Sequence, residues 1–297
     1  MRHRTALACA ALLLAVPLAG CLPGPDDATI RDSYTSEYHY DLSVKPDGTL
    51  TNVTLYLPLP VENGSSVVAE RILLGQNMSQ QERREGFAFD GRLPDWNYSV
   101  AETAHGPMLA IRTDEIPAEF NTPQPIDPET GERLPVPEDE EPVPETYSLS
   151  VRLVSDERVR TASALQHEPV LEPKLNLTRT DRHCDTEASP ELECYVYDSR
   201  FMLSYDANAS TEVDVGVTFD GSNGWFTGGW TGNDYHDFTN AVVTGPQDGW
   251  VAARGEFDQG SGNYLPDRLR WNVSPEGRTE PRGSASEGGL EGAAASG

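Results

Sequence analysis

The feature that most constrains the fold is a repeated alternation of apolar and polar residues with a period of two. In the clearest case Val213, Val215, Val217 and Phe219 lie on one face of an extended chain. Such alternation is typical of a β-strand with one buried face. We find no amphipathic helix of ordinary length, which would show a period of 3.6 residues. The sequence therefore predicts an all-β fold.

Turn residues separate the predicted strands. Pro46-Asp47-Gly48 lies between alternating segments at 34–44 and 53–59, and this arrangement predicts a hairpin. A second hairpin is predicted over residues 98–113, whereas the apolar run 67–74 fits either a helix or a strand. Many short strands joined by glycine and proline predict an antiparallel β-sandwich, of which an immunoglobulin-like arrangement is one form.

The N-terminus has the parts of an export signal. Arg2 and Arg4 precede an apolar stretch at 6–19, which is too short for an ordinary membrane-spanning helix of about 20 residues. The stretch ends in Leu18-Ala19-Gly20-Cys21. This motif resembles the lipobox of prokaryotic lipoproteins, and the resemblance implies cleavage before Cys21 and lipidation of its thiol. We expect a protein held on the extracellular side of the cell membrane by lipid alone.

Composition divides the chain into segments. Proline and acidic residues dominate 117–145, where Arg133 is the single base, so an extended solvated loop is predicted there. The predicted segments are a signal peptide at 1–20, a lipidated tether at 21–31, a β-rich ectodomain at 32–274 and a disordered tail at 275–297. The ectodomain forms either one unit or two lobes, at about 32–180 and 181–274.

The charge of the chain is strongly negative. Aspartate and glutamate number 48 against 22 lysine and arginine residues, giving a formal net charge of −26. Such a chain lacks the basic face that nucleic acid binding needs. Lys45 and Lys174 are the only lysines. This acid excess with scarce lysine resembles the proteins of halophilic archaea, in which molar salt screens the carboxylates and keeps the protein soluble.

Two cysteines remain for the exported protein after Cys9 leaves with the signal peptide and Cys21 is lipidated. Cys184 and Cys194 form an even pair in an oxidising compartment, which predicts a disulfide bond. The alternative is a metal site that adds His183, but the paired C-x-x-C spacing of structural zinc sites is missing. We expect no metal and no cofactor.

Sequons for N-glycosylation are frequent in the exported part of the chain. Glycans require surface positions, so each asparagine used should be exposed. The candidate asparagines are Asn52, Asn63, Asn77, Asn97, Asn176, Asn208 and Asn272. We expect only some of them to be used.

The segment 223–235 is rich in tryptophan, glycine and asparagine. In an exposed loop, aromatic rings would stack on sugar faces while polar side chains bind hydroxyl groups. The candidate ligand-binding residues are Trp225, Trp230, Asn233, Asp234 and Tyr235. Alternatively the rings fill the core of the sandwich, which we favour because tryptophans beside strands usually pack inward.

Enzyme motifs are missing. The sequence has no G-x-S-x-G, H-E-x-x-H, P-loop or G-x-G-x-x-G motif, so we expect no enzyme activity.

Our first hypothesis is a lipid-anchored cell-surface protein that acts as a structural or interaction module. One alternative is an accessory lipoprotein that binds carbohydrate or another solute through 223–235, and another is a hydrolase with dispersed acidic residues. Partners would be surface glycans or other envelope proteins.

Overall fold

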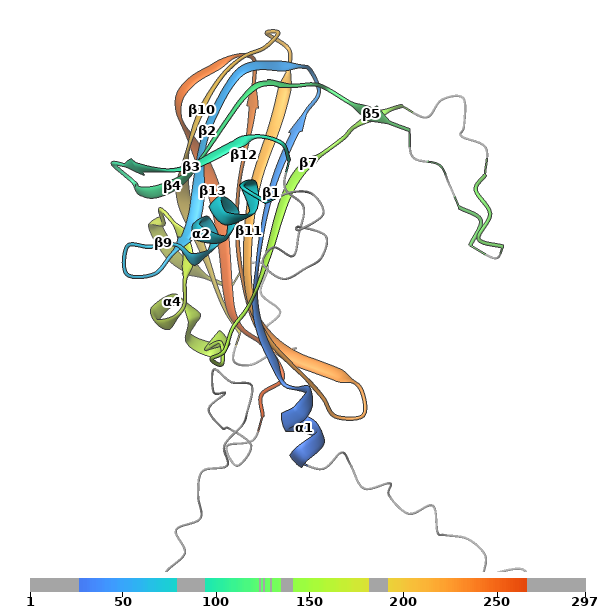
Figure 1. Cartoon of the computed structure of the whole chain (residues 1–297), viewed down its shortest axis with the longest axis vertical. Coiled ribbons are helices and arrows are strands. Elements are labelled where there is room, and N and C mark those ends of the chain that lie inside the picture. Colours follow the sequence, from blue (N-terminus) through green and yellow to red (C-terminus); the bar gives the residue numbers. More distant parts are fainter. Residues whose placement is uncertain are drawn as a thin grey trace, which may run out of the picture.

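A long antiparallel sheet that curls around one apolar core makes up most of the molecule (Figure 1). This computed structural model describes residues 27–78, 94–122, 124, 126–128, 130–134, 141–181 and 192–265. The predicted signal peptide and tail lie outside these ranges. Within them, no helix is both long and apolar enough to cross a membrane.

The elements are mostly strands, as the two-residue alternation predicts. The strands are β1 (Thr35–Pro46), β2 (Leu50–Val61), β3 (Asn97–Thr103), β4 (Gly106–Ile116), β5 (Phe120–Asn121), β6 (Val143–Pro144), β7 (Tyr147–Val154), β8 (Val170–Glu172), β9 (Leu175–Thr180), β10 (Glu193–Asp206), β11 (Glu212–Phe226), β12 (Trp230–Thr244) and β13 (Gln247–Gly262). The helices are α1 (Asp27–Ser33), α2 (Val67–Gln76), the short η1 (Thr161–Ser163) and α4 (Ala164–His167).

Strands distant in sequence lie side by side in the sheet. Its order is β3-β4-β2-β10-β13-β12-β11-β1-β7, with β8 added to β2 and β9 added to β10. Because β1 pairs with β11 and β2 with β10, the strands of the second suggested lobe lie between strands of the first in one sheet. The described part of 32–274 therefore shares one continuous sheet and one main core, an arrangement that favours a single unit over two lobes.

The predicted hairpin of residues 34–59 does not form. Strands β1 and β2 follow one another, but β1 pairs with β7 and β11 whereas β2 pairs with β4, β8 and β10. The turn residue Asp47 bonds to the start of β11 instead: its amide donates to the Glu212 carbonyl and its carboxylate accepts from the Glu212 amide. The chain therefore crosses from one layer to the other at this turn.

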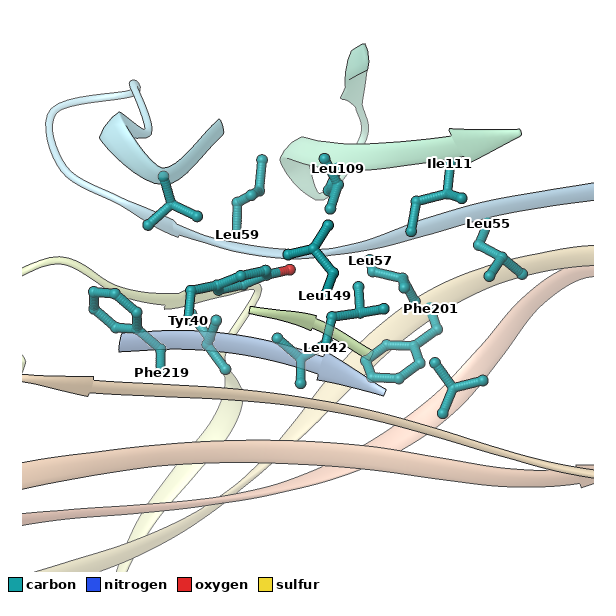
Figure 2. Packing of buried hydrophobic residues seen from close by; sticks show 14 of the residues in the cluster. Tyr40, Leu42, Leu55, Leu57, Leu59, Leu109, Ile111, Leu149, Phe201 and Phe219 are labelled. Carbon is teal, nitrogen blue, oxygen red and sulfur yellow. The ribbon is translucent and has the colours of Figure 1, made fainter. Parts of the chain in front are cut away.

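The core lies between the two facing parts of the curled sheet. Figure 2 shows Leu42 of β1 and Leu57 of β2 pointing into the same interior, together with Leu149 and Phe201. The all-β antiparallel prediction is confirmed. The two layers belong to one sheet, because hydrogen-bonded strand pairs run without a break from β3 to β7. An immunoglobulin-like sandwich would have two separate sheets.

Helix α2 covers the space between the two edges of the sheet. It contacts β2, β3 and β7, and it buries Val68, Ala69 and Ile72 against the core. The Ser66 side chain caps its first turn by accepting a hydrogen bond from the Ala69 amide. The ambiguous apolar run 67–74 is thus a helix whose inward face completes the core.

The proline-rich acidic segment projects away from the sheet (Figure 1). In its described part, β5 and β6 form a two-stranded ladder, and Ile126 bridges to Arg133. Most of the described side chains in this ladder and bridge are exposed. The exposure agrees with the predicted solvated loop, but the short ladder and the bridge are regular structure that the sequence did not predict.

Candidate functional site

The tryptophan-rich segment is the turn end of the β11–β12 hairpin. Trp225 is 3 % exposed and Tyr235 is fully buried, whereas Trp230 is 71 % exposed. Asn233 is buried as well, and Asp234 faces solvent. The five candidate residues therefore do not share one surface, and the buried rings of Trp225 and Tyr235 agree with the favoured core alternative, whereas the exposed Trp230 does not.

Trp225 attaches helix α1 to the end of the sheet. Its ring stacks on Tyr34 with the centroids 5.9 Å apart, and it packs with Ile30 and Leu265 in a small second core. The Phe226 amide also donates a hydrogen bond to the Ser33 hydroxyl at 2.9 Å. Residues 27–31, which the sequence assigned to the tether, are thus part of a packed helix.

Two buried amides hold the neighbouring 159–163 segment in place. The Asn223 side chain accepts from the Val159 amide and donates to the Val159 carbonyl. Asn233 accepts from Asn223 and from the Thr161 hydroxyl, and it donates to the Asn263 carbonyl. These groups are satisfied inside the protein, so Asn233 is a structural residue rather than a ligand-binding one.

A cleft that sequence analysis did not predict opens beside this segment. It has a volume of about 580 Å³ and lies between the N-terminal end of α2, the end of β7 and the segment around α4. We call it the Tyr38 cleft. Its walls include Tyr38, Glu62, Val67, Val154, Arg160 and Glu168. Sequence spacing gives no signal for it, because the lining residues come from five separate segments of the chain.

Tyr38 and Glu168 form the polar wall of the Tyr38 cleft. The Tyr38 hydroxyl donates to Glu168 Oε2 at 2.5 Å, and the Arg160 amide donates to Glu168 Oε1 at 2.8 Å. Burial raises the pKa of the Glu168 carboxyl above its usual range, and the nearby Glu62 charge adds to the rise. The Tyr38 ring is itself held by stacking on Phe219 at 5.6 Å.

A second groove of about 640 Å³ lies on the outer face of the sheet, where β9 runs beside β10. Asp198, Arg254 and Glu256 line it together with the exposed Asn176, whose side chain donates to Asp198. Asn176 is one of the candidate glycosylation sites, and a glycan attached there would lie at this groove. We therefore regard the Tyr38 cleft as the better candidate for a ligand.

Of the other predicted sites, the two cysteines and the sequon asparagines, some lie within the described residues and some outside them. Cys194 lies in β10 and is largely buried, but Cys184 is outside the described residues, so the disulfide stays a prediction. Cys21 and Asn272 are outside them too. The remaining six sequon asparagines are all exposed, as glycosylation requires: Asn52, Asn63, Asn77, Asn97, Asn176 and Asn208.

Comparisons with known proteins found no relative of this chain. No protein-family model, curated protein or solved structure matches the chain.

Proposed function

We propose that this chain is a lipid-anchored cell-surface protein that acts as an interaction module, with the Tyr38 cleft as its binding site. The lipobox resemblance at Leu18-Ala19-Gly20-Cys21 supports the anchor. The observation that carries the proposal is that the helix after the anchor packs onto β11, a strand of the same sheet whose residues also line an open cleft. Such a molecule would present that cleft at a fixed place on the cell surface.

The anchored end of the molecule can be assigned from α1. Asp27 follows Cys21 by six residues, which reach about 20 Å at most when fully extended. Helix α1 contacts β11, so a lipid on Cys21 would lie near the end of the sheet that carries the β11–β12 turn (Figure 1). The opposite end, where Pro46 and Asp206 terminate β1 and β10, would then face away from the membrane.

The walls of the Tyr38 cleft indicate the chemistry of its ligand. Val67 and Val154 are 60 % and 70 % exposed there, so two apolar side chains are left uncovered on its walls. Glu62 and Arg160 place both signs of charge beside it. This combination suits an extended peptide segment of another envelope protein, with alternating apolar and charged side chains.

The hydrolase alternative has less support from the same cleft. Both carboxylate oxygens of Glu168 accept hydrogen bonds from the protein itself, from Tyr38 and from Arg160. They are held in the wall instead of being directed at a ligand. Binding without chemistry therefore suits this geometry better.

The solute-binding alternative keeps one observation in its favour, the exposed Trp230. The ring lies edge-on to Phe226 at the turn of the hairpin, with centroids 6.0 Å apart. Quenching of tryptophan fluorescence by surface polysaccharide, lost in Trp230→Ala, would support this role.

Site-specific photo-crosslinking on whole cells tests the main proposal. A photoreactive amino acid at Val154 should link to a protein partner, whereas the same amino acid at Val242 should not. Val242 is a matched control, because it is also an exposed strand valine but lies on β12 away from the cleft. Absence of a Val154-specific product, or equal products at both positions, would contradict the proposal.

The anchor is tested separately with Cys21→Ser. We expect the protein to be released into the medium or to accumulate as an uncleaved precursor. A mature protein of unchanged mass that still sediments with membranes would contradict lipidation at this residue.

A further inference from the structure

A lysine and an aspartate meet in the interior of the molecule. Lys174, between β8 and β9, has a side chain 5 % exposed, and Asp237 of β12 is fully buried. Lys174 Nζ lies 2.5 Å from Asp237 Oδ2. Lys45, the other lysine, is exposed on β1. A buried ion pair is weak evidence for a stabilising role, because desolvation opposes the attraction. The position of Lys174 therefore calls for another explanation.

The surroundings of the pair are largely aromatic. Lys174 Nζ lies 4.2 Å from the centre of the Tyr197 ring and 5.5 Å from that of Phe257. Burial lowers the pKa of the Lys174 amine, although the Asp237 charge acts in the opposite direction. A neutral amine is a nucleophile, and desolvation is one of the ways in which proteins activate lysine.

The Asp237 carboxyl is held by donors on both oxygens. The Tyr197 hydroxyl donates to Oδ1 at 2.7 Å, and the Leu171 amide donates to Oδ2 at 2.7 Å. Burial and the neighbouring Asp237 raise the pKa of the Tyr197 phenol, so its hydroxyl remains a donor. Donors fixed around a carboxyl stabilise the negative charge that develops when a nucleophile attacks its carbon.

A second carboxyl lies close to the pair. Glu172 Oε2 accepts a hydrogen bond from the Lys174 backbone amide at 3.0 Å. Burial raises the pKa of the Glu172 carboxyl, and the Asp237 charge contributes to the rise. A carboxyl with a raised pKa can carry a proton between an amine and a leaving oxygen near neutral pH.

We propose that Lys174 and Asp237 condense into an intramolecular amide cross-link. The Lys174 nitrogen attacks Cγ of the protonated Asp237 carboxyl, a C–N bond forms, and the Cγ–Oδ2 bond breaks. Tyr197 stabilises Oδ1 during the attack, and Glu172 relays one amine proton to the departing oxygen. One water molecule leaves, and no oxidant or other reactant is needed.

The cross-link would join two parts of the sheet covalently. The connection between β8 and β9 would be tied to β12, closing a loop that contains β9, β10 and β11. It would also remove the buried charges, because an amide is neutral. For a protein exposed on a cell surface, this bond would stay closed at any salt concentration.

Trypsin digestion of the full chain, purified from membranes, denatured and reduced, tests the proposal. Trypsin cleaves after lysine and arginine but not after an acylated lysine. Without the cross-link, the digest contains the free peptide 161–174. With it, this peptide is missing, and 161–179 is joined to 201–254 with a mass lower by one water molecule. Peptide 161–174 contains no sequon, so glycans do not affect its detection.

Lys174→Arg is the matched control, because it keeps the positive charge beside Asp237 but does not condense with it. Its digest should contain the corresponding free peptide in full amount. Glu172→Gln should leave both residues in place and increase the fraction of free 161–174 above that of the wild type. Free, unmodified 161–174 in stoichiometric amount from the wild-type chain would overturn the proposal, whether or not the variants fold.

Discussion

The hydroxyl group of Tyr40 in β1 donates a hydrogen bond to the carbonyl oxygen of Pro58 in β2 at a distance of 3.0 Å. Both residues are buried, and their strands do not pair with each other. The bond therefore crosses the interior between the two facing layers, where Figure 2 shows the Tyr40 ring. Since proline has no amide hydrogen, its carbonyl is the backbone group that remains to be satisfied there.

Tyr40→Phe tests the importance of this bond. It leaves the Pro58 carbonyl buried without its Tyr40 partner, so we expect the free energy of unfolding to fall by about 1–2 kcal/mol. The measurement is urea denaturation at constant molar potassium chloride. Tyr56→Phe on the outer face of β2 is the control and should change stability by less than about 0.5 kcal/mol. Equal effects of the two substitutions would contradict the assigned role.

The two tryptophans of the β11–β12 turn should behave differently. Trp225→Ala removes the stacking on Tyr34 and the contacts to Ile30, so we expect a loss of about 3 kcal/mol and detachment of α1. Trp230→Ala removes an exposed ring and should change stability by less than about 0.5 kcal/mol. Thermal melts at high salt compare them, and proteolysis near residue 33 reports the release of α1. A larger effect at Trp230 would contradict the structure.

Salt should control folding, because the net charge is −26. In molar salt the Debye length is about 3 Å, whereas at 0.01 M it is about 30 Å and many carboxylates repel one another at once. Net stability is only about 5–15 kcal/mol, so this summed repulsion is sufficient to unfold the domain. Circular dichroism and tryptophan fluorescence across a potassium chloride series should show cooperative loss of structure on dilution. A melting temperature that is constant across the series would remove the main support for a halophilic origin.

Stability should also decrease as the pH rises from about 4 to about 6. Burial raises the pKa of Asp258 to about 6, and the carboxylates of Asp234 and Asp220 add to the rise, although His236 opposes it. The folded state therefore binds a proton over a range in which the unfolded chain, with a pKa of about 3.9, has lost it. Proton release on raising the pH thus removes stability.

Asp258→Asn should flatten this pH profile, since the amide does not titrate, and it should raise stability at pH 7. Melting temperatures between pH 4 and 7 at fixed salt provide the measurement. Asp248→Asn, an exposed carboxyl on the same strand, is the control for loss of one surface charge. A profile in Asp258→Asn as steep as that of the wild type would show that another group carries the pH dependence.

Local pattern was sufficient to predict much of the secondary structure. The alternation at 213–219 forms part of β11, and residues 98–113 form the β3–β4 hairpin around Gly106, whose φ of 96° suits glycine. Both depend on neighbours in sequence, since side-chain alternation and turn chemistry act over a few residues. The described sequon asparagines are exposed for a local reason as well, because they are polar residues in polar stretches of the sequence.

Only the tertiary structure decided which strands pair and which side chains meet. Pro46-Asp47-Gly48 has the composition of a hairpin turn, but Asp47 forms hydrogen bonds with Glu212 at the start of β11, and β2 continues in the opposite layer. Trp225 and Trp230 lie in one short segment, and only the docking of α1 buries one and leaves the other exposed. Lys174 and Asp237 are 63 residues apart and meet at 2.5 Å. The sequence by itself determined the strands, because these follow local periodicity. The partners were decided by burial of a common core, which depends on contacts between residues distant along the chain.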